Sequence, residues 1–185
     1  PERIGKKTIA LALARYLETG VFDSPYDLDG NVIDVLGDCM LVAPDEKGVI
    51  GIDAVRNIKY FLWQKPNRSH YRTVIVDDSH LLTQEAQNAL LKITENPPIS
   101  SLVIVTSRNP EFLRPTLSSR LQKVYMAPIS YDDMQKWLGT ALGCSVEQAR
   151  EIAAQSFQQP GRAWSFLKDK AFQSLHRSAK RFLSA

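Results

Sequence analysis

The sequence has few of the features that mark membrane proteins, disulfide-bonded proteins or strongly basic proteins. Its apolar runs fall short of the roughly 18 residues that span a bilayer, and its opening segment, PERIGKKTIA, has charges where a signal peptide needs an apolar stretch. Its two cysteines, Cys39 and Cys144, lie outside any C-x-x-C pair, which predicts buried thiols and no disulfide framework or cysteine zinc site. A net charge of +3 is too small to indicate nucleic-acid binding by itself. We therefore expect a cytoplasmic globular protein without a membrane partner.

Strand-like and helix-like segments alternate along most of the chain. The strand-like segments are apolar without clean alternation, which is typical of strands buried on both faces; they cover 32–44, 72–78, 101–107 and 122–128. The helix-like segments have apolar residues at helical spacing; they are 6–18 (Ile9, Leu13, Ala14, Leu17), 53–64 (Val55, Ile58, Leu62) and 84–95 (Ala86, Leu90, Ile93). This alternation predicts an α/β fold with a parallel sheet.

The pattern changes after Pro128 to helices alone. Three helix-start signals follow, two capping-box pairs and one proline suited to a first helical turn. They are Ser130 with Asp133, Ser145 with Gln148, and Pro160. We therefore predict an α/β domain at 1–128 and a small three-helix domain at 129–185, with Phe157 on the buried face of the second helix.

Two adjacent carboxylates, Asp77 and Asp78, come at the carboxyl end of a strand that should be central and buried. Open α/β sheets bind ligands at this edge. The pair looks like a Walker B element, in which the first acid holds magnesium, often through water, and the second orients the attacking water. The alternative is a pair of solvated acids that open a turn before Thr83 caps the next helix.

The helix that follows carries the most specific pattern in the chain. EAQNALLKITENPP at 85–98 resembles the segment EAQNALLKTLEEPP that bacterial DNA polymerase III clamp-loader subunits place directly after Walker B. A generic amphipathic helix needs the apolar spacing, but not these polar residues and the double-proline stop together. The resemblance is to the delta-prime type, with the gamma/tau type as the near alternative. It implies an AAA+ P-loop NTPase core and a helical lid, with the first strand of the core and the family's collar domain expected outside this chain.

The opening PERIGKKT resembles the end of a P-loop, G-x-x-x-x-G-K-[ST], in which Gly5, the helix start and Lys6 would face phosphate. Two positions depart from that pattern. Lys7 stands where a serine or threonine hydroxyl ligates magnesium, and Arg3 stands where the family usually has a glycine that lets phosphate approach the backbone. Thr8 does not replace the missing hydroxyl, because one further helical residue turns the side chain by about 100°.

Position 78 also departs from the pattern of an active ATPase. Active AAA+ subunits usually have glutamate there, and aspartate is one methylene shorter; misplacing the attacking water by about 1 Å can cost on the order of a hundredfold in rate. We therefore expect a degenerate site at which ATP and Mg²⁺ bind weakly or not at all. Related subunits also insert a four-cysteine zinc module before Walker B, and this sequence has only Cys39 between positions 20 and 39, so no zinc site is visible. Either this lineage lacks the module or the module was left out of this sequence.

Three further residues are assigned by the resemblance. Ser107 is placed at the sensor-one position, with Thr106 as the neighbouring candidate; a hydroxyl that ends a strand is otherwise an ordinary turn residue. Arg120 corresponds to the arginine finger that reaches ATP held by the adjacent subunit. Alternatively, it complements a helix C-terminus. Arg162 corresponds to the sensor-two arginine of the lid, and a purely structural role is equally open.

These assignments lead to one leading hypothesis and two rivals. The leading hypothesis is a subunit that does little chemistry at its own site and supplies Arg120 to a neighbouring ATPase subunit while the sliding clamp is loaded on primed DNA. Its partners would be gamma/tau and delta subunits in a hetero-oligomer, the clamp, and DNA bound through its phosphates. The rivals are an active gamma/tau-like ATPase and another AAA+ protein of replication or recombination.

Overall fold

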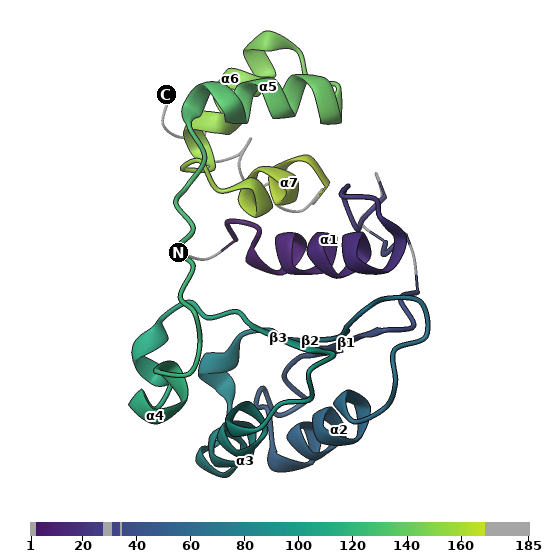
Figure 1. Cartoon of the computed structure of the whole chain (residues 1–185). Coiled ribbons are helices and arrows are strands. Elements are labelled where there is room, and N and C mark those ends of the chain that lie inside the picture. Colours follow the sequence, from purple (N-terminus) through teal and green to yellow (C-terminus); the bar gives the residue numbers. More distant parts are fainter. Residues whose placement is uncertain (1–2, 28–30, 34, 169–185) are drawn as a thin grey trace. The chain divides into compact units, whose positions relative to one another are not determined.

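The computed structural model describes residues 3–27, 31–33 and 35–168, which form two compact units (Figure 1). One unit is Lys6–Val124, and the other joins residues 3–5 to residues 125–168. Residues 169–185, the last part of the predicted three-helix domain, lie outside the described residues. None of the helices in the described ranges is long and apolar enough to cross a membrane.

The larger unit is built on a three-stranded parallel sheet, which confirms the predicted α/β fold. Strands β1 (Cys39–Val42), β2 (Arg72–Val76) and β3 (Ser101–Val105) lie in the order β1-β2-β3, with Val42 opposite Val76 and Val76 opposite Val105. All five residues of β2 are buried, so the strand before the two acids is central, as predicted.

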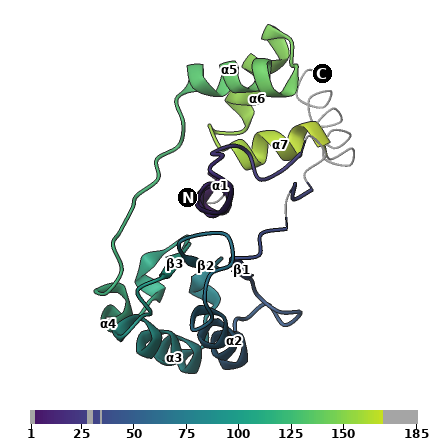
Figure 2. The ribbon, with the colours of Figure 1, turned by 45° about the vertical axis from the view of Figure 1, so that its right-hand side comes forward.

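Helices cover both faces of this sheet (Figure 2). Helices α2 (Ile52–Leu62) and α3 (Gln84–Glu95) pack on one face, where Val74 and Val76 join the main core. Helix α1 (Lys6–Thr19) packs on the other face against Ile75. Because successive strand side chains point to opposite faces, β2 supplies both cores and has no solvated face.

The buried faces of α2 and α3 are the predicted ones, whereas that of α1 is only partly as predicted. Ala10, Leu11 and Ala14 form the contact face of α1, whereas Ile9 is 49% exposed. Of the predicted stripe, Ala14 is buried, Leu13 and Leu17 are half-buried and Ile9 is exposed, so the prediction was wrong for Ile9. Two alanines spaced by four residues allow the helix backbone to approach the sheet closely, and this fit outweighs the burial of the larger isoleucine.

The segment 122–128 was predicted to be a strand, and this was wrong. All seven residues are described, and none pairs with another strand. Val124 and Tyr125 are each 81% exposed, and the division between the two units falls between them. A β-branched and aromatic composition favours a strand only where a pleated, half-buried surface is available to it.

The smaller unit contains the three predicted helices. They are α5 (Tyr131–Leu142), α6 (Val146–Gln155) and α7 (Pro160–Lys168). Ser145 and Gln148 form a complete capping box on α6, and Pro160 begins α7, as predicted. Ser130 caps α5 by accepting from the N–H of Asp133, but the Asp133 carboxylate accepts from the Ser130 hydroxyl and not from its backbone, so the second predicted box is only half formed. Phe157 does not join the core: α6 ends at Gln155, and Phe157 is 67% exposed with a φ of 51°.

A buried ion pair closes the amino-terminal end of the sheet. Arg72, the first residue of β2, lies with its Nη1 3.4 Å from Oδ1 of Asp38, and both side chains are almost completely buried. Burial raises the pKa of the Asp38 carboxyl, but the backbone N–H groups of Ser69, Arg68 and Asn67 and the Arg72 guanidinium outweigh it and hold the pKa below its usual value. Both buried charges at this end of the sheet are therefore paired with each other and hydrogen-bonded to the backbone.

Candidate functional site

The candidate site lies at the opposite end of the sheet, where β2 and β3 finish. The N–H of Asp77 donates to Val42 O and that of Thr106 donates to Val76 O, so both residues directly extend the strand ladders. The Thr106 hydroxyl donates to Asp77 Oδ1 at 2.6 Å and accepts from the N–H of Asp78 at 3.2 Å. Thr106 therefore joins the two acids, and it is buried.

A lysine from α1 pairs with the first acid. Lys7 Nζ lies 3.6 Å from Asp77 Oδ2, and the two side chains are 39% and 18% exposed. Helix α1 has no acidic residue in its first turn to offset Lys6 and Lys7 at its positive end. Asp77 therefore provides Lys7 with the negative charge that the helix itself lacks.

The second acid turns towards another cation. Arg108 Nε lies 3.2 Å from Asp78 Oδ1, and His80 Nδ1 lies 3.8 Å from the same oxygen. Asp78 has a φ of 50°, in the left-handed region that aspartate tolerates better than most residues, including glutamate. A local backbone requirement thus favours aspartate at this position.

Polar groups in the turn after β2 are held at some energetic cost. Ser79 Oγ and His80 Nδ1 are buried and have no hydrogen-bond partner among the described residues. Together with the left-handed Asp78, they place three unfavourable features in the short 3-10 helix η1 (Ser79–Leu81) and its N-cap. Such features cluster at functional sites, where the surrounding fold maintains them.

Tyr26 also lies close to the acids. Burial raises the pKa of its phenol, and the negative charge of Asp77 raises it further. The side chain packs with α1 and with Ile75 on the same face of the sheet. Tyr26 therefore stays protonated at neutral pH and forms one neutral wall beside Asp77.

The site residues do not fit a magnesium ion. Asp77 and Asp78 supply two negative charges, and Lys7 and Arg108 already lie against them. Magnesium needs oxygen ligands in near-octahedral geometry, and the Lys7 ammonium lies within 4 Å of the oxygen that would hold it. No group of three or more potential metal-binding side chains occurs among the described residues.

Two residues of the predicted phosphate loop have left-handed backbone conformations. Gly5 has a φ of 91° and Arg3 a φ of 53°, so both lie in the left-handed region. The Arg3 carbonyl accepts a hydrogen bond from Gly161 N at 2.9 Å, and its guanidinium donates to Ser165 Oγ at 3.3 Å, within the smaller unit. A Cβ added at position 161 would lie 3.0 Å from the Arg3 side chain and carbonyl oxygen, so this close contact favours glycine.

Of the two hydroxyls proposed for the sensor position, the fold brings Thr106 rather than Ser107 to the acids. The Ser107 hydroxyl donates instead to the carbonyl of Asn109 at 2.9 Å. It stabilises the turn after β3, which is the ordinary role considered for it. The two positions are adjacent in sequence, so the resemblance alone could not separate them.

Arg120 lies away from these acids, just after the short helix α4 (Pro115–Ser118). Its Nη2 donates to Glu95 Oε1 at 2.9 Å, and its Nη1 donates to Thr116 O at 3.2 Å. The bond to a helix-end carbonyl fits the structural alternative. The side chain nevertheless remains 39% exposed, so the guanidinium is accessible to a partner.

A buried amide connects α3 to the segment that carries Arg120. Gln87 Nε2 donates to the carbonyls of Phe112 and Leu82, and its Oε1 accepts from the N–H of Arg114 at 2.9 Å. Arg114 is the N-cap residue of α4. Gln87 therefore fixes where α4 begins. Its position three residues before Leu90 on the buried helical face was a signal for this role in the sequence.

Arg162 belongs to the smaller unit. Its guanidinium lies over the ring of Phe157, 5.1 Å from the ring centroid, and its N–H donates to Gln159 O. This contact is a structural role of the kind left open for it. Arg162 also lies in the first turn of α7, directly after the Gly161 that contacts Arg3.

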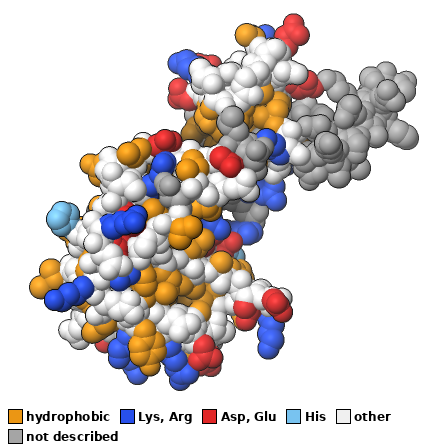
Figure 3. All heavy atoms as spheres, turned by 90° about the vertical axis from the view of Figure 1, so that its right-hand side faces the viewer, with side chains coloured by type: hydrophobic (Ala, Val, Ile, Leu, Met, Phe, Trp, Pro, Cys, Tyr) orange, Lys and Arg blue, Asp and Glu red, His pale blue; other side chains and the backbone are white. Residues whose placement is uncertain are grey.

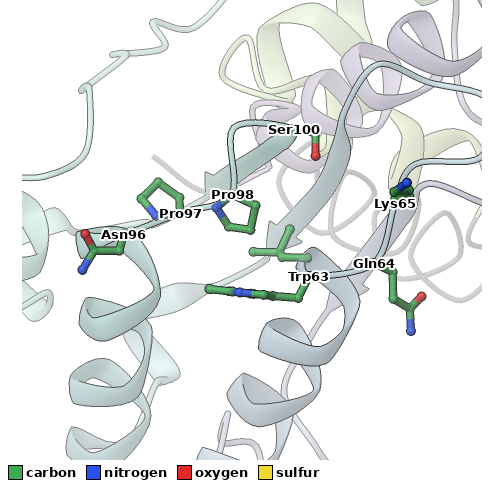
Figure 4. A pocket seen from close by; sticks show the side chains of 8 residues that line it. Trp63, Gln64, Lys65, Asn96, Pro97, Pro98 and Ser100 are labelled. Atoms are coloured by element: carbon green, nitrogen blue, oxygen red, sulfur yellow. The ribbon is translucent and has the colours of Figure 1, made fainter.

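A separate pocket lies at the amino-terminal side of the sheet (Figure 4). It has a volume of about 200 Å³ and is lined by the end of α2 and the loop after α3. The lining includes Trp63, Lys65, Pro97 and Pro98. Because open α/β sheets bind ligands at the carboxyl ends of their strands, this pocket is not the predicted nucleotide site. Side chains of both charges are interspersed on the face shown in Figure 3.

Comparison with known proteins identifies similar chains. A family model described as DNA polymerase III, delta subunit, matches residues 29–130. DNA polymerase III subunit delta' of Escherichia coli K12 is 32% identical over 138 residues, which is 74% of this chain and 41% of that protein. The gamma/tau subunit of Mycobacterium tuberculosis H37Rv is 33% identical over 131 residues, 65% of this chain and 22% of that protein. The chain thus spans less than half the length of these relatives.

Solved structures agree with the fold. A gamma subunit-related protein of DNA polymerase III from Thermotoga maritima has a TM-score of 0.59 at 26% identity, covering 89% of this chain and 51% of that one. A RuvB variant from the same organism has a TM-score of 0.50 at 17% identity, covering 90% of this chain and 60% of the other. The second likeness concerns the fold alone.

Proposed function

This chain belongs to the DNA polymerase III delta-subunit family, and on that premise we propose that it acts in a clamp loader as a subunit of the delta-prime type. Its α/β unit has the AAA+ fold. In this proposal the subunit does little or no ATP hydrolysis of its own. It supplies Arg120 to the nucleotide site of a neighbouring ATPase subunit during loading of the sliding clamp on primed DNA.

The observation that carries the proposal is the contact between Lys7 and Asp77. An ammonium group 3.6 Å from the acid that would hold magnesium supplies a positive charge without any Lewis-acid chemistry. Arg108 binds the second acid, which is then unavailable to orient a water molecule. Lys6 and the backbone N–H groups in the first turn of α1 attract anions. The site is therefore compatible with phosphate binding that does not need magnesium.

Arg120 supports the second half of the proposal. It is partly exposed, and Leu117 on the same short segment is completely buried in the main core, which fixes the backbone from which Arg120 projects. A planar guanidinium can bind two oxygens of a phosphoryl group as charge develops on it. A fixed backbone and an accessible guanidinium are what an arginine finger requires.

The remaining partners in the proposal are other subunits of the same assembly, the sliding clamp and DNA. Gamma/tau and delta subunits would form the hetero-oligomer. DNA would be bound through its phosphates, without reading of base sequence. We further propose 129–185 as the lid and residues 1–128 as the nucleotide-fold domain, with Ser107 or Thr106 at sensor one and Arg162 at sensor two.

Reconstitution of the loader with an Arg120→Ala subunit tests the finger. We expect DNA-stimulated hydrolysis at the adjacent site to fall about 10³-fold, the lower end of the range for arginine fingers supplied in trans. Single-turnover measurement with the other sites blocked would isolate that site. Lys136→Ala, which removes a cation that is 77% exposed on α5, is the matched control. Unchanged hydrolysis and clamp loading with Arg120→Ala would reject the finger role.

The rival proposals differ in nucleotide binding and in partners. An active gamma/tau-like ATPase must bind ATP tightly and with magnesium dependence, whereas we expect undetectable or magnesium-insensitive binding to the full-length subunit. Equilibrium binding with and without a chelator separates the two. An AAA+ protein without a clamp partner would fail to co-purify with the other loader subunits.

A further inference from the structure

The side chain that binds Arg120 defines a second functional element. Glu95 is the last residue of α3, and its carboxylate meets the Arg120 guanidinium at 2.9 Å. An acidic residue at a helix C-terminus is placed unfavourably relative to the helix dipole. The unfavourable position of Glu95 is therefore offset by the arginine, and the contact brings together residues that are 25 positions apart.

The geometry points to Glu95 as a positioning residue that holds Arg120 back until a nucleotide-loaded neighbour is present. This inference rests on the proposed role of Arg120 as a finger. Nη2 is the group bound to Glu95, whereas Nη1 is bound to the Thr116 carbonyl on its own segment. The guanidinium can exchange the carboxylate for phosphate oxygens at Nη2 while Nη1 stays anchored to Thr116.

The contact has a strength suited to such an exchange. Arg120 and Glu95 are 39% and 41% exposed, and ion pairs of this exposure shift an equilibrium by no more than about fivefold. A single carboxylate can thus hold the Arg120 side chain in the free subunit, but the more highly charged triphosphate of ATP can displace that carboxylate. A buried pair would be too strong to release.

The test uses the full-length subunit with Glu95→Gln, reconstituted with its partner subunits, clamp and primed DNA. Glutamine keeps the shape and removes the charge that competes with ATP. We expect the KM for ATP at the adjacent site to fall about two- to fivefold, because a larger fraction of Arg120 is free, while kcat stays within about twofold. The difference from the unmodified subunit should shrink at high salt, which weakens the exposed pair.

Three further variants distinguish the possible outcomes. Glu95→Asp retains the charge but withdraws it by one methylene, so the KM for ATP should lie between the values for the unmodified subunit and for Glu95→Gln. Asp53→Asn removes the carboxylate of another exposed ion pair, 2.7 Å from Arg56, and should leave KM unchanged. In the double variant with Arg120→Ala, Glu95→Gln should have no further effect if Glu95 acts through Arg120.

Failure of this inference differs from failure of the finger. If Arg120→Ala lowers hydrolysis but Glu95→Gln leaves KM unchanged, the finger stands and the holding role is wrong. If Glu95→Gln lowers kcat as Arg120→Ala does, Glu95 supports the active position of the arginine and does not withhold it. If Arg120→Ala has no effect, the finger itself is rejected.

Discussion

The two ends of the central strand β2 carry charged residues in opposite environments. At its start, Arg72 and Asp38 have side chains 6% and 1% exposed, and Arg72 also donates to the carbonyls of Lys65 and Gly37. At its end, Asp77 and Lys7 are 18% and 39% exposed and make a longer contact. The first pair is sealed into the fold, whereas the second remains within reach of solvent and ligands.

This difference separates charges that stabilise the fold from charges available for function. Removing water from an ion pair is costly, and the cost is met at Arg72 by a full set of hydrogen bonds. At Asp77 the opposing charge comes from a flexible lysine, which a ligand or a substitution can displace. The following predictions test the comparison, beginning with the largest expected effect.

Arg72→Met should destabilise the α/β unit most. It leaves the Asp38 carboxylate buried without its cation, and breaking a buried ion pair from one side typically costs about 3–5 kcal/mol. The change is measured as the free energy of unfolding in urea. Arg56→Met is the control, because the Arg56–Asp53 pair is exposed and should contribute less than about 1 kcal/mol. Equal effects of the two substitutions would contradict the comparison.

Acid should act on the same end of the sheet. The folded pKa of Asp38 is lowered, so its contribution to stability is complete above its unfolded pKa, about 3.9, and is lost as the pH falls through the folded pKa. We therefore expect the urea concentration at the unfolding midpoint to decrease when the pH is lowered below about 4. Asp38→Asn should lower the midpoint at pH 7 and reduce its further loss in acid. If Asp38→Asn lost stability in acid as steeply as the unmodified protein does, Asp38 would not be the group responsible for that loss.

Thr106→Val should have an intermediate effect at the carboxyl end. It removes the buried hydroxyl that joins Asp77 to the N–H of Asp78, and leaving such groups unsatisfied costs about 1–3 kcal/mol. Ser107→Ala is the matched control and should cost less than about 1 kcal/mol, because its hydroxyl bonds only to a carbonyl in its turn. A larger loss for Ser107→Ala would assign the important hydroxyl to Ser107.

Lys7→Thr should have the smallest effect on stability, below about 1 kcal/mol, because the pair it breaks is partly exposed. Its effect on binding should be qualitative: with the ammonium gone and a hydroxyl present, ATP binding should become dependent on magnesium. Lys6→Thr, the control, should weaken nucleotide binding without introducing that dependence. Identical magnesium responses of unmodified and Lys7→Thr subunits would reject the interpretation that Lys7 keeps magnesium from the site.

The elements that sequence reasoning predicted well are those with a repeated local signal. In α2 and α3, apolar residues recur at helical spacing, and the buried faces followed. Thr83, Ser130 and Ser145 have the short polar side chains that cap helices, and each caps one. Such patterns depend on residues within a few positions of one another, so these helices and caps can be predicted from short stretches of sequence.

The predictions that failed depended on surfaces distant in sequence. The segment 122–128 has strand-like composition but finds no strand to pair with, and the contact face of α1 was selected by the shape of the sheet it meets. Arg108, Glu95 and Tyr26 were not identified beforehand. Each acts through a partner at least 25 positions away, and nothing near these residues in the sequence marks that partner.

The amino-acid order alone was enough to establish the α/β class, the central strand before Asp77 and Asp78, and the family, because periodicity and a specific segment at 85–98 are local properties. The state of the site was a different matter. That Lys7 lies against Asp77, Arg108 against Asp78 and Glu95 against Arg120 depends on chain folding that joins separate elements. Electrostatic pairing falls off with distance in space and not with distance in sequence, so only the tertiary structure could reveal which charges meet.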